Sequence, residues 1–344
     1  MEQPQEYILE IEDLHLYFEK KTSTVKAVNG ISFRLKRGET FGLLGESGCG
    51  KTMTCKTILK LIPENGKIKK GSIRYNGQEI LNLSNREMRK IRGKEIGMIF
   101  QEPMTALNPV LKIREQILEQ FIETKMSKEE KETKAIEMLR LVGIPSPETR
   151  LNDYIHQYSG GMRQRAMIAI ALAAGPKILL ADEPTTALDV TIQAQIIQLI
   201  NSLKETLAMS IILITHDLGV VSQMCDNVAV MYAGYVMEMS DTLTVFSTPR
   251  HPYTEGLMHS LPRDENGDEA LEPIQGAPPD LENLPKGCPF AERCKYEEKK
   301  CREEVPGLVQ IAPGHWVRCY YWQKLDQAKG LIEVNRPREG GRPV

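Results

Sequence analysis

The first 36 residues alternate between short apolar runs and polar or Gly-containing breaks. The runs at 8–11 and 31–35 are rich in β-branched and aromatic side chains, which predicts antiparallel strands. A uniformly apolar run at 41–44 predicts a buried strand, and a Gly-rich loop separates it from a helix that starts at about Lys51. Residues 71–77 predict a further strand that ends in an Asn-Gly turn. The chain therefore opens with β structure and continues into a strand–loop–helix unit.

Helices and short apolar strands alternate in the middle of the chain. Residues 111–142 are strongly helical in pattern, and a second helix is predicted at about 162–174. The runs at 177–181 and 211–215 are apolar throughout, as in strands buried on both faces of a parallel sheet. Residues 191–207, between these runs, are again helical in pattern. This alternation predicts an α/β fold with right-handed crossovers.

The composition changes after about residue 248, where prolines interrupt the chain. They stand at Pro249, Pro252, Pro262, Pro273, Pro278, Pro279, Pro285 and Pro289. Because proline removes a backbone donor and breaks regular elements, this part is predicted to be a separate, loop-rich extension. The predicted division is a first domain at 1–248, with a helical subdomain at about 104–170, and an extension at 249–344.

Length, charge and hydropathy exclude several classes of protein. The 344 residues are 41% hydrophobic, which suits one large domain or two smaller domains with real cores. A net charge of -2 gives no overall attraction to nucleic acid or anionic lipid. The polar start resembles no targeting segment. Apolar stretches such as 167–174 are far shorter than the roughly 20 residues that span a bilayer. We therefore expect any membrane association to go through a partner.

A loop with the P-loop pattern G-x-x-x-x-G-K-[ST] lies between the predicted strand at 41–44 and the following helix. Its glycines let backbone N–H groups turn inward around phosphate oxygens, and the helix N-terminus adds a positive dipole. Lys51 can reach the β- and γ-phosphates, and the Thr52 hydroxyl can bind Mg²⁺. The sequence therefore predicts ATP binding by Gly45, Glu46, Ser47, Gly48, Cys49, Gly50, Lys51 and Thr52.

Two carboxylates and a Ser-Gly-Gly sequence add further chemistry. Asp182 and Glu183 directly follow the apolar run at 177–181, where Asp182 suits control of Mg²⁺ and Glu183 is placed to polarise an attacking water.

The Ser-Gly-Gly sequence is a separate motif. Ser159 can cap a helix while Gly160 and Gly161 leave backbone N–H groups bare. This makes a second phosphate-binding surface. It lies so far along the chain from the P-loop that one chain need not close both surfaces on one nucleotide.

Residues 158–165 resemble the signature sequence of ABC-type ATPases, whose usual form begins Leu-Ser-Gly-Gly. Tyr158 stands where leucine is usual, which we interpret as a packing position. The resemblance covers residues 6 to about 245. It implies that two such domains hold ATP between the P-loop of one and the signature of the other. The further residues that it singles out are Gln101 as a sensor of Mg²⁺ and water, Asp189 in the D-loop at 187–189, His216 as the switch residue at the γ-phosphate, and Phe18 (with Tyr17 as second choice) as the aromatic that stacks on adenine.

Several motifs narrow the resemblance to the ATPases of oligopeptide and dipeptide importers. They are residues 102–109, 159–165 and 251–254, together with the C-terminal cysteines. The resemblance implies a P-loop α/β core with an antiparallel β subdomain, a helical signature subdomain and a loop-rich, metal-binding C-terminal extension. It implies catalysis of ATP hydrolysis by Glu183 and His216, with Mg²⁺, on the cytoplasmic face of a bacterial or archaeal cell membrane.

The same resemblance implies a set of partners. They are two transmembrane permease subunits, a second ATPase subunit that is a related chain or another copy, and indirectly an external substrate-binding protein. The stretch after Gln101 is expected to contact the permease subunits. The expected cargo is a di- or oligopeptide, with nickel or oligosaccharides as alternatives, and no nucleic acid is expected to bind.

Four of the seven cysteines cluster near the C-terminus, at Cys288, Cys294, Cys301 and Cys319. A reducing cytosol disfavours disulfides, and unrelated buried cysteines do not account for such crowding in a Pro-rich segment. The spacing C-x5-C-x6-C-x17-C leaves a structural zinc ion and a [4Fe–4S] cluster open, since both accept four thiolates. The surrounding residues resemble the peptide-importer extension, and that resemblance favours a structural [4Fe–4S] cluster, with zinc as the alternative.

Two other classes of P-loop protein fit the sequence less well. Soluble ABC ATPases of DNA repair or translation usually carry long coiled coils or tandem cassettes, whereas this chain has one cassette and no long heptad array. Other P-loop enzymes, such as kinases, lack the Ser-Gly-Gly signature at 159–161. The sequence therefore predicts the ATP-hydrolysing subunit of an ABC importer.

Overall fold

The computed structural model describes residues 6–186, 188–260 and 273–325. Within these residues, the first of two sheets is antiparallel and has the strand order β2-β1-β4-β5. Asn76 and Gly77, both with positive φ, form the turn between its last two strands, as the sequence predicted. The strands of this sheet are β1 (Tyr7–Glu19), β2 (Thr24–Lys36), β4 (Gly66–Tyr75) and β5 (Gln78–Glu79).

The second sheet has the order β11-β12-β10-β9-β3-β8-β7-β6 among the described residues. Its strands from β9 to β6 in that order are parallel, and β3, β7 and β8 are buried at every position, which confirms the predicted parallel α/β sheet. Their bounds are β3 (Thr40–Leu44), β6 (Ile96–Ile99), β7 (Ile178–Asp182), β8 (Ser210–Thr215), β9 (Asn227–Tyr232), β10 (Tyr235–Asp241), β11 (Val309–Ala312) and β12 (His315–Val317).

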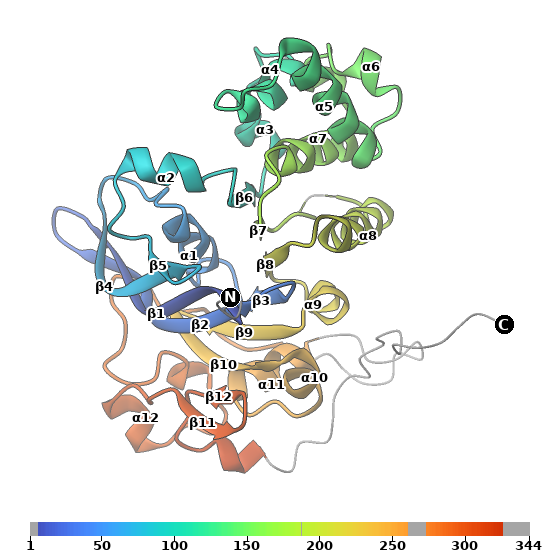
Figure 1. The fold of residues 1–344 in the computed structure, drawn as a ribbon. Coiled ribbons are helices and arrows are strands. Elements are labelled where there is room, and N and C mark those ends of the chain that lie inside the picture. Colours follow the sequence, from blue (N-terminus) through green and yellow to red (C-terminus); the bar gives the residue numbers. More distant parts are fainter. Residues whose placement is uncertain (1–5, 187, 261–272, 326–344) are drawn as a thin grey trace, which may run out of the picture.

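A helical lobe stands at one end of this sheet, at the top of Figure 1. It agrees with the predicted helical subdomain, but the single helical stretch expected at 111–142 is interrupted at 122–127. Ser127 explains the interruption, because it caps a new helix through a capping box with Glu130. The lobe contains α3 (Pro103–Ala106), α4 (Ile113–Leu118), η1 (Glu119–Phe121), α5 (Lys128–Leu141), α6 (Pro147–Arg150), η2 (Ile155–Gln157) and α7 (Gly160–Leu172).

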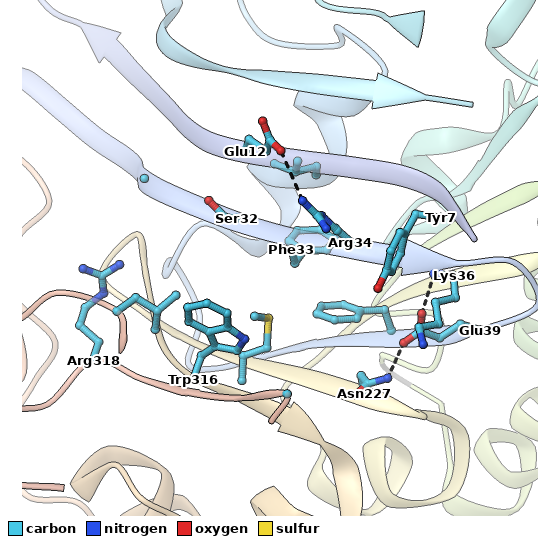
Figure 2. Close-up of a pocket in the computed structure, with 16 residues that line it drawn as sticks. Tyr7, Glu12, Ser32, Phe33, Arg34, Lys36, Glu39, Asn227, Trp316 and Arg318 are labelled. Carbon is cyan, nitrogen blue, oxygen red and sulfur yellow. Dashed lines mark hydrogen bonds and ion pairs between the residues drawn. The ribbon is translucent and has the colours of Figure 1, made fainter. Parts of the chain in front are cut away.

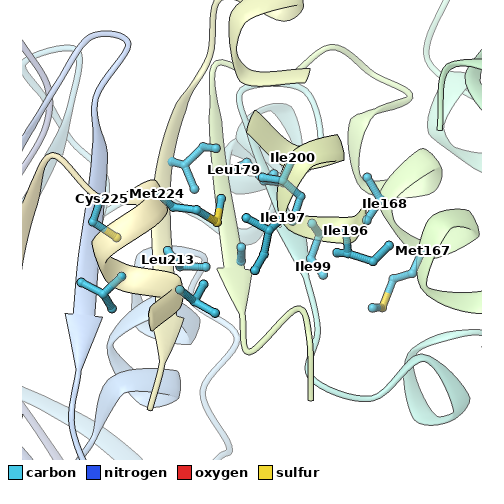
Figure 3. Close-up of a cluster of buried hydrophobic side chains, with 14 of the residues drawn as sticks. Ile99, Met167, Ile168, Leu179, Ile196, Ile197, Ile200, Leu213, Met224 and Cys225 are labelled. Carbon is cyan, nitrogen blue, oxygen red and sulfur yellow. The ribbon is translucent and has the colours of Figure 1, made fainter. Parts of the chain in front are cut away.

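The core lies between the parallel sheet and the helices that cover it. Figure 3 shows Ile200 of α8 beside Leu179 of the sheet, in the cluster that also contains Ile196 of α8 and Leu213 of the sheet. All four side chains are fully buried, and each contributes roughly 1.5–3 kcal/mol of hydrophobic stabilisation. The remaining helices before the extension are α1 (Lys51–Ile58), α2 (Asn85–Ile91), α8 (Val190–Leu207), α9 (Leu218–Met224) and α10 (Thr242–Ser247).

The C-terminal extension is loop-rich, as predicted, but it is joined to the rest of the fold. Strand β12 pairs with β10, and the Lys26 N–H donates to the Leu281 carbonyl at 3.1 Å. The extension therefore continues the second sheet. The domain boundary expected at residue 248 stays a prediction. Its helices are α11 (Pro252–His259), η3 (Ala291–Arg293), α12 (Lys299–Glu303) and η4 (Trp322–Leu325).

A cavity of about 630 Å³ separates the extension from the first sheet. Figure 2 shows Trp316 of the extension on one side of it and Phe33 of β2 on the other. Phe41 and Asn227, which also line it, stand at the amino-terminal ends of β3 and β9. The cavity is therefore at the opposite end of these strands from the P-loop. No helix in the described ranges is long and apolar enough to span a bilayer.

Candidate active site

The predicted site residues follow neighbouring strands of the parallel sheet. The P-loop follows β3, His216 follows β8, Glu183 follows β7, and Gln101 comes shortly after β6. Since β3, β8, β7 and β6 are consecutive and parallel in the sheet, their carboxyl ends lie at one edge. Ligands of open α/β sheets bind at this edge, so the fold brings together residues that are far apart in sequence.

The glycines of the P-loop stand where a side chain would not fit. A Cβ on Gly45 would lie 2.2 Å from the Met231 carbonyl oxygen, and one on Gly50 would lie 2.3 Å from the Ala27 carbonyl oxygen. Both have positive φ, at 154° and 105°, so a larger residue would also be strained. Lys51, at the start of α1, is buried and its Nζ donates to the Gly45 carbonyl at 2.6 Å. The P-loop glycines thus pack against neighbouring backbone, and the Lys51 side chain is hydrogen-bonded to the loop itself.

Thr52 and Asp182 meet across the gap between α1 and β7. The Thr52 hydroxyl donates to Asp182 Oδ1 at 2.8 Å. Burial raises the pKa of Asp182, although the hydrogen bond from Thr52 acts in the opposite direction. A hydroxyl and a carboxylate are oxygen ligands of the kind that Mg²⁺ prefers. Thr52, a predicted Mg²⁺ ligand, is therefore in contact with Asp182, which was predicted to control Mg²⁺.

Glu183 is the point on which three other side chains converge. Its Oε2 accepts hydrogen bonds from Gln101 Nε2 and Thr186 Oγ1, both at 2.9 Å, and its Oε1 lies 3.3 Å from His216 Nδ1. Its backbone has φ of 45°, a left-handed conformation that is costly for a residue with a side chain. Such strain persists only where the surroundings enforce it and is concentrated at functional sites.

The carboxyl of Glu183 is held in its ionised form. Burial raises its pKa, but the hydrogen bonds from Thr186 and His216 and the electrostatic attraction to His216 and Lys51 together outweigh burial, so the pKa lies below its ordinary value. A carboxylate that is ionised at neutral pH can accept a proton from water. Thr186 was not among the predicted site residues, although it lies only three positions beyond Glu183.

The signature motif starts a helix in the lobe. Ser159 is the N-cap of α7 and accepts a hydrogen bond from the Met162 N–H at 3.4 Å, as predicted. Tyr158 is buried and its hydroxyl donates to the Arg150 carbonyl at 2.9 Å, which confirms the interpretation as a packing position. Figure 1 shows α7 in the helical lobe and α1 well below it, beside the sheets. Within one chain, the two predicted phosphate-binding surfaces are therefore apart.

Two predicted residues lie at the margins of the site. Asp189 is the N-cap of α8 and accepts from the Ile192 N–H at 3.0 Å, whereas Ala187 of the D-loop lies outside the described residues. Phe18 is half-buried near the end of β1 and packs against Gly66, where a Cβ would lie 3.0 Å from its ring. The adenine-stacking role of Phe18, or of Tyr17 as second choice, stays a prediction.

Comparisons with known proteins agree with this geometry. Residues 28–186 match the family described as ABC transporter, and residues 237–301 match oligopeptide/dipeptide transporter, C-terminal region. The chain is 50% identical over 316 residues to the oligopeptide transport ATP-binding protein OppD of Bacillus subtilis, covering 91% of this chain and 88% of that protein. The chain belongs to this family of ABC transporter ATP-binding subunits. As a member, it is an ATPase, which confirms the predicted activity.

Other similar proteins support the same assignment. This ATP-binding subunit is 48% identical over 320 residues to the OppD protein of Salmonella typhimurium, covering 92% of this chain and 95% of that protein. Among solved structures, a dimeric ATP-binding cassette in a post-hydrolysis state with ADP and Pi, MJ0796, matches with a TM-score of 0.62 and 28% identity. That match covers 68% of this chain and 98% of the cassette, so part of this chain has no counterpart in the cassette.

The four clustered cysteines of this ATP-binding subunit line one cavity in the extension. Burial raises the pKa of Cys288 to about 12 and that of Cys294 and Cys319 to about 11, and neighbouring cysteines of the set add to each shift. In the parts of the chain that the structure describes, however, no group of three or more His, Cys, Asp or Glu side chains is placed to hold a metal ion. The side-chain placement thus gives no support to the metal-binding part of the predicted fold.

One of these cysteines accepts a backbone hydrogen bond. Cys319 Sγ lies 3.3 Å from the Tyr321 nitrogen, whose N–H donates to it. His251, which also lines the cavity, is fully buried. The cavity therefore has four sulfur atoms, an N–H group directed at one of them, and a buried imidazole.

The extension also reaches the P-loop, which the sequence did not predict. Arg293 binds the Glu46 carboxylate with both terminal nitrogens, at 2.8 and 3.1 Å, and the Glu46 N–H donates to the Tyr253 hydroxyl at 3.0 Å. Tyr253 lies in one of the segments that carried the peptide-importer resemblance, and Arg293 directly precedes Cys294. The places of Tyr253 and Arg293 in these segments are the only sequence signal that could have pointed to them. Contacts between residues more than 200 positions apart leave no local pattern in the sequence.

Proposed function

We propose that Glu183 accepts the proton of the water that hydrolyses ATP. The convergence of Gln101, Thr186 and His216 on its carboxylate carries this proposal. The water oxygen attacks the γ-phosphorus, the bond from that phosphorus to the bridging oxygen of ADP breaks, and the proton of water passes to Glu183. His216 holds the γ-phosphate region, and Gln101 senses the water and Mg²⁺.

The remaining residues bind the nucleotide and its metal ion. Lys51 and the N–H groups of residues 45–50 hold the phosphates, and Phe18 stacks on adenine. Thr52 and Gln101 would bind Mg²⁺, with Asp182 controlling the ion through its contact with Thr52, and the ion would neutralise charge on the phosphates. Ser159, Gly160 and Gly161 complete the site of the opposite subunit, and Asp189 of the D-loop contributes to the same nucleotide site. The dimeric state of the similar solved cassette supports this arrangement across two subunits.

We infer that the energy of this cycle drives peptide import. The similar proteins of Bacillus subtilis and Salmonella typhimurium are oligopeptide transport ATP-binding proteins. Two permease subunits, a second ATPase subunit and, indirectly, an external binding protein would complete a transporter, with this subunit on the cytoplasmic face of the membrane. Met104 and Val110, shortly after Gln101, are 50% and 75% exposed, which suits a contact with the permease subunits.

Deleting this chain is expected to abolish uptake of labelled di- and oligopeptides in its host and to leave nickel and oligosaccharide uptake unchanged. The measurement is uptake of each labelled cargo, with restoration by the intact chain as the control. The tagged chain should also retain two permease subunits when purified from detergent-solubilised membranes. Loss of nickel uptake with normal peptide uptake would assign another cargo, and retention of no membrane subunit would favour a soluble ATPase.

The four-cysteine cavity is the site that we propose for a [4Fe–4S] cluster. Cys288, Cys294, Cys301 and Cys319 supply the four thiolates that such a cluster needs. The hydrogen bond from the Tyr321 N–H to Cys319 Sγ suits a thiolate ligand. The cluster would cross-link short segments that contain few regular elements, which is a structural role. Zinc is the alternative occupant, since it also accepts four thiolates.

Protein purified without oxygen is expected to be brown and to contain about four irons and four acid-labile sulfides per chain. Cys301→Ser should lose most of this iron, because one ligand is removed. Cys225→Ala, at a buried cysteine at the end of α9, should retain it. Metal analysis and absorption spectra measure both. Colourless wild-type protein with one zinc per chain would refute the cluster and leave the ATPase assignment intact.

A further inference from the structure

Glu46 places a carboxylate inside the loop that is proposed to hold phosphates. ATP brings several negative charges to this loop, and like charges disfavour binding wherever water cannot screen them. The Glu46 side chain is 27% exposed, so solvent screens it only in part. An acidic residue at this position therefore requires a compensating charge if the loop is to accept ATP.

Arg293 supplies that charge from the C-terminal extension. Its Nη1 lies 2.8 Å from Glu46 Oε2 and its Nη2 lies 3.1 Å from Glu46 Oε1, which is a bidentate pair. The Arg293 side chain is only 6% exposed, so the interaction is poorly screened by solvent and counterions. The two residues are 247 positions apart in sequence, so the pair forms only when the extension has folded against the cassette.

The guanidinium is fixed in place by further contacts. Its Nε donates to the Gln275 carbonyl at 3.0 Å, Nη2 donates to the Ile274 carbonyl at 3.3 Å, and Nη1 donates to the Tyr232 hydroxyl at 3.2 Å. Its carbon also lies 5.6 Å from the centre of the Tyr232 ring, at the end of β9. Arg293 thus has little freedom to leave Glu46.

The backbone of Glu46 is held as well as its side chain. Its N–H donates to the Tyr253 hydroxyl at 3.0 Å, and its carbonyl accepts from Lys51 Nζ at 2.9 Å. Tyr253 is fully buried against Tyr232 and Phe290, with ring centres 4.7 and 5.4 Å apart. A continuous set of contacts therefore runs from the extension through Glu46 to the lysine of the P-loop.

We propose that Arg293 is a positioning residue for ATP binding, which neutralises Glu46 and orients it so that the P-loop accepts phosphates. This inference rests on the proposed role of residues 45–52 as the phosphate site. A different reading of the same contacts is that the ion pair only attaches the extension to the cassette. The two interpretations differ in what happens when the Glu46 charge is removed from the Arg293→Gln variant. If Arg293 balances the charge of Glu46, this second change restores ATP binding. If Arg293 only attaches the extension, the second change does not restore it.

Arg293→Gln is expected to raise the KM for ATP and the Kd of a fluorescent ATP analogue by about tenfold, with kcat within about twofold of wild type. The reason is that the negative charge of Glu46, within the phosphate-binding loop, is then no longer balanced by Arg293. Adding Glu46→Gln removes the excess charge, so the double variant should return to within about threefold of wild type. Both constants are measured on the assembled transporter, with thermal unfolding recorded to verify the fold.

Arg302→Gln is the matched control, since Arg302 is also next to a cysteine of the cavity but is exposed and pairs with Glu297. It should leave the KM for ATP unchanged. A double variant that binds ATP as weakly as Arg293→Gln, or more weakly, would overturn the proposal, as would wild-type affinity in Arg293→Gln. Lys51→Ala tests separately whether residues 45–52 hold the phosphates. Unchanged nucleotide binding in that variant would refute the P-loop role itself.

Discussion

Replacing Glu183 with glutamine is expected to lower ATP hydrolysis by about a hundredfold or more while ATP binding persists. Glutamine keeps the size of the side chain and can still bond to Thr186 and Gln101 after an amide rotation, but it cannot take a proton from water. General base catalysis typically contributes about 10²–10⁴-fold, which sets the scale of the loss. Steady-state phosphate release from the assembled transporter and equilibrium nucleotide binding measure the two quantities.

The same variant should accumulate a closed, ATP-bound pair of ATPase subunits. If closure follows binding and opening follows hydrolysis, blocking hydrolysis traps the closed state, which size-exclusion chromatography with ATP can detect. Glu205→Gln is a suitable control, because it makes the same chemical change at an exposed position late in α8. Turnover near the wild-type rate in Glu183→Gln would remove Glu183 from the mechanism.

The pKa of Glu183 gives this role a dependence on pH. Because that pKa lies below its ordinary value, the carboxylate is ionised throughout the neutral range. The base is lost only as the pH falls through this lowered pKa. A loss of activity at mildly acidic pH would therefore have to come from another group.

Local motifs account for most of what the sequence predicted correctly. The P-loop, the acids at the end of β7 and the cap of α7 each depend on a few adjacent residues, so their structure follows from local rules. The parallel sheet was predicted from apolar runs of strand length. The family resemblance then supplied the other candidate site residues, such as Gln101 and His216. These features identified the residues that the fold brings to one edge of the sheet.

Features that depend on distant contacts could not be predicted in this way. The pairing of β12 with β10 joins the extension to the second sheet, yet β12 is short and is bounded by irregular chain on its C-terminal side. Nothing in the sequence pairs Arg293 with Glu46 of the P-loop, since only the folded chain reveals their contact. The break before Ser127 is a different case, because its capping box with Glu130 is a local signal that the helical pattern at 111–142 obscured.

The extension and the P-loop of this subunit are joined by a continuous set of side-chain contacts. Tyr253 of α11 and Arg293 of η3 both bind Glu46, and Phe290 packs against Tyr253. Cys294, a proposed cluster ligand, is covalently next to Arg293. Whatever orders the four-cysteine cavity thus also orders the counter-charge of the P-loop, even though the cavity and the predicted catalytic residues are far apart in sequence.

Gly161→Asp is expected to reduce turnover by at least about a hundredfold while this subunit's own P-loop still binds nucleotide. In the proposed dimer, Gly161 faces the γ-phosphate held by the opposite subunit, so an added carboxylate repels the charge that hydrolysis must stabilise. Within this chain a Cβ at Gly161 would lie 3.2 Å from Ile192 Cγ2, a tight contact that requires Ile192 to move by a few tenths of an ångström. Nucleotide binding by the isolated subunit and turnover by the assembled transporter measure the two effects.

Gly160→Asp shows whether charge or crowding causes the loss. A Cβ at Gly160 meets no atom within 4 Å, so this variant adds the same carboxylate at the start of α7 without displacing Ile192. It should lose turnover as well, because the repulsion acts across the subunit interface. Gly307→Asp adds an identical charge at an exposed and equally open glycine of the extension, and turnover there should remain normal. If Gly161→Asp also abolished nucleotide binding by the isolated subunit, the signature would not act across the dimer, since only its own P-loop is present in that experiment.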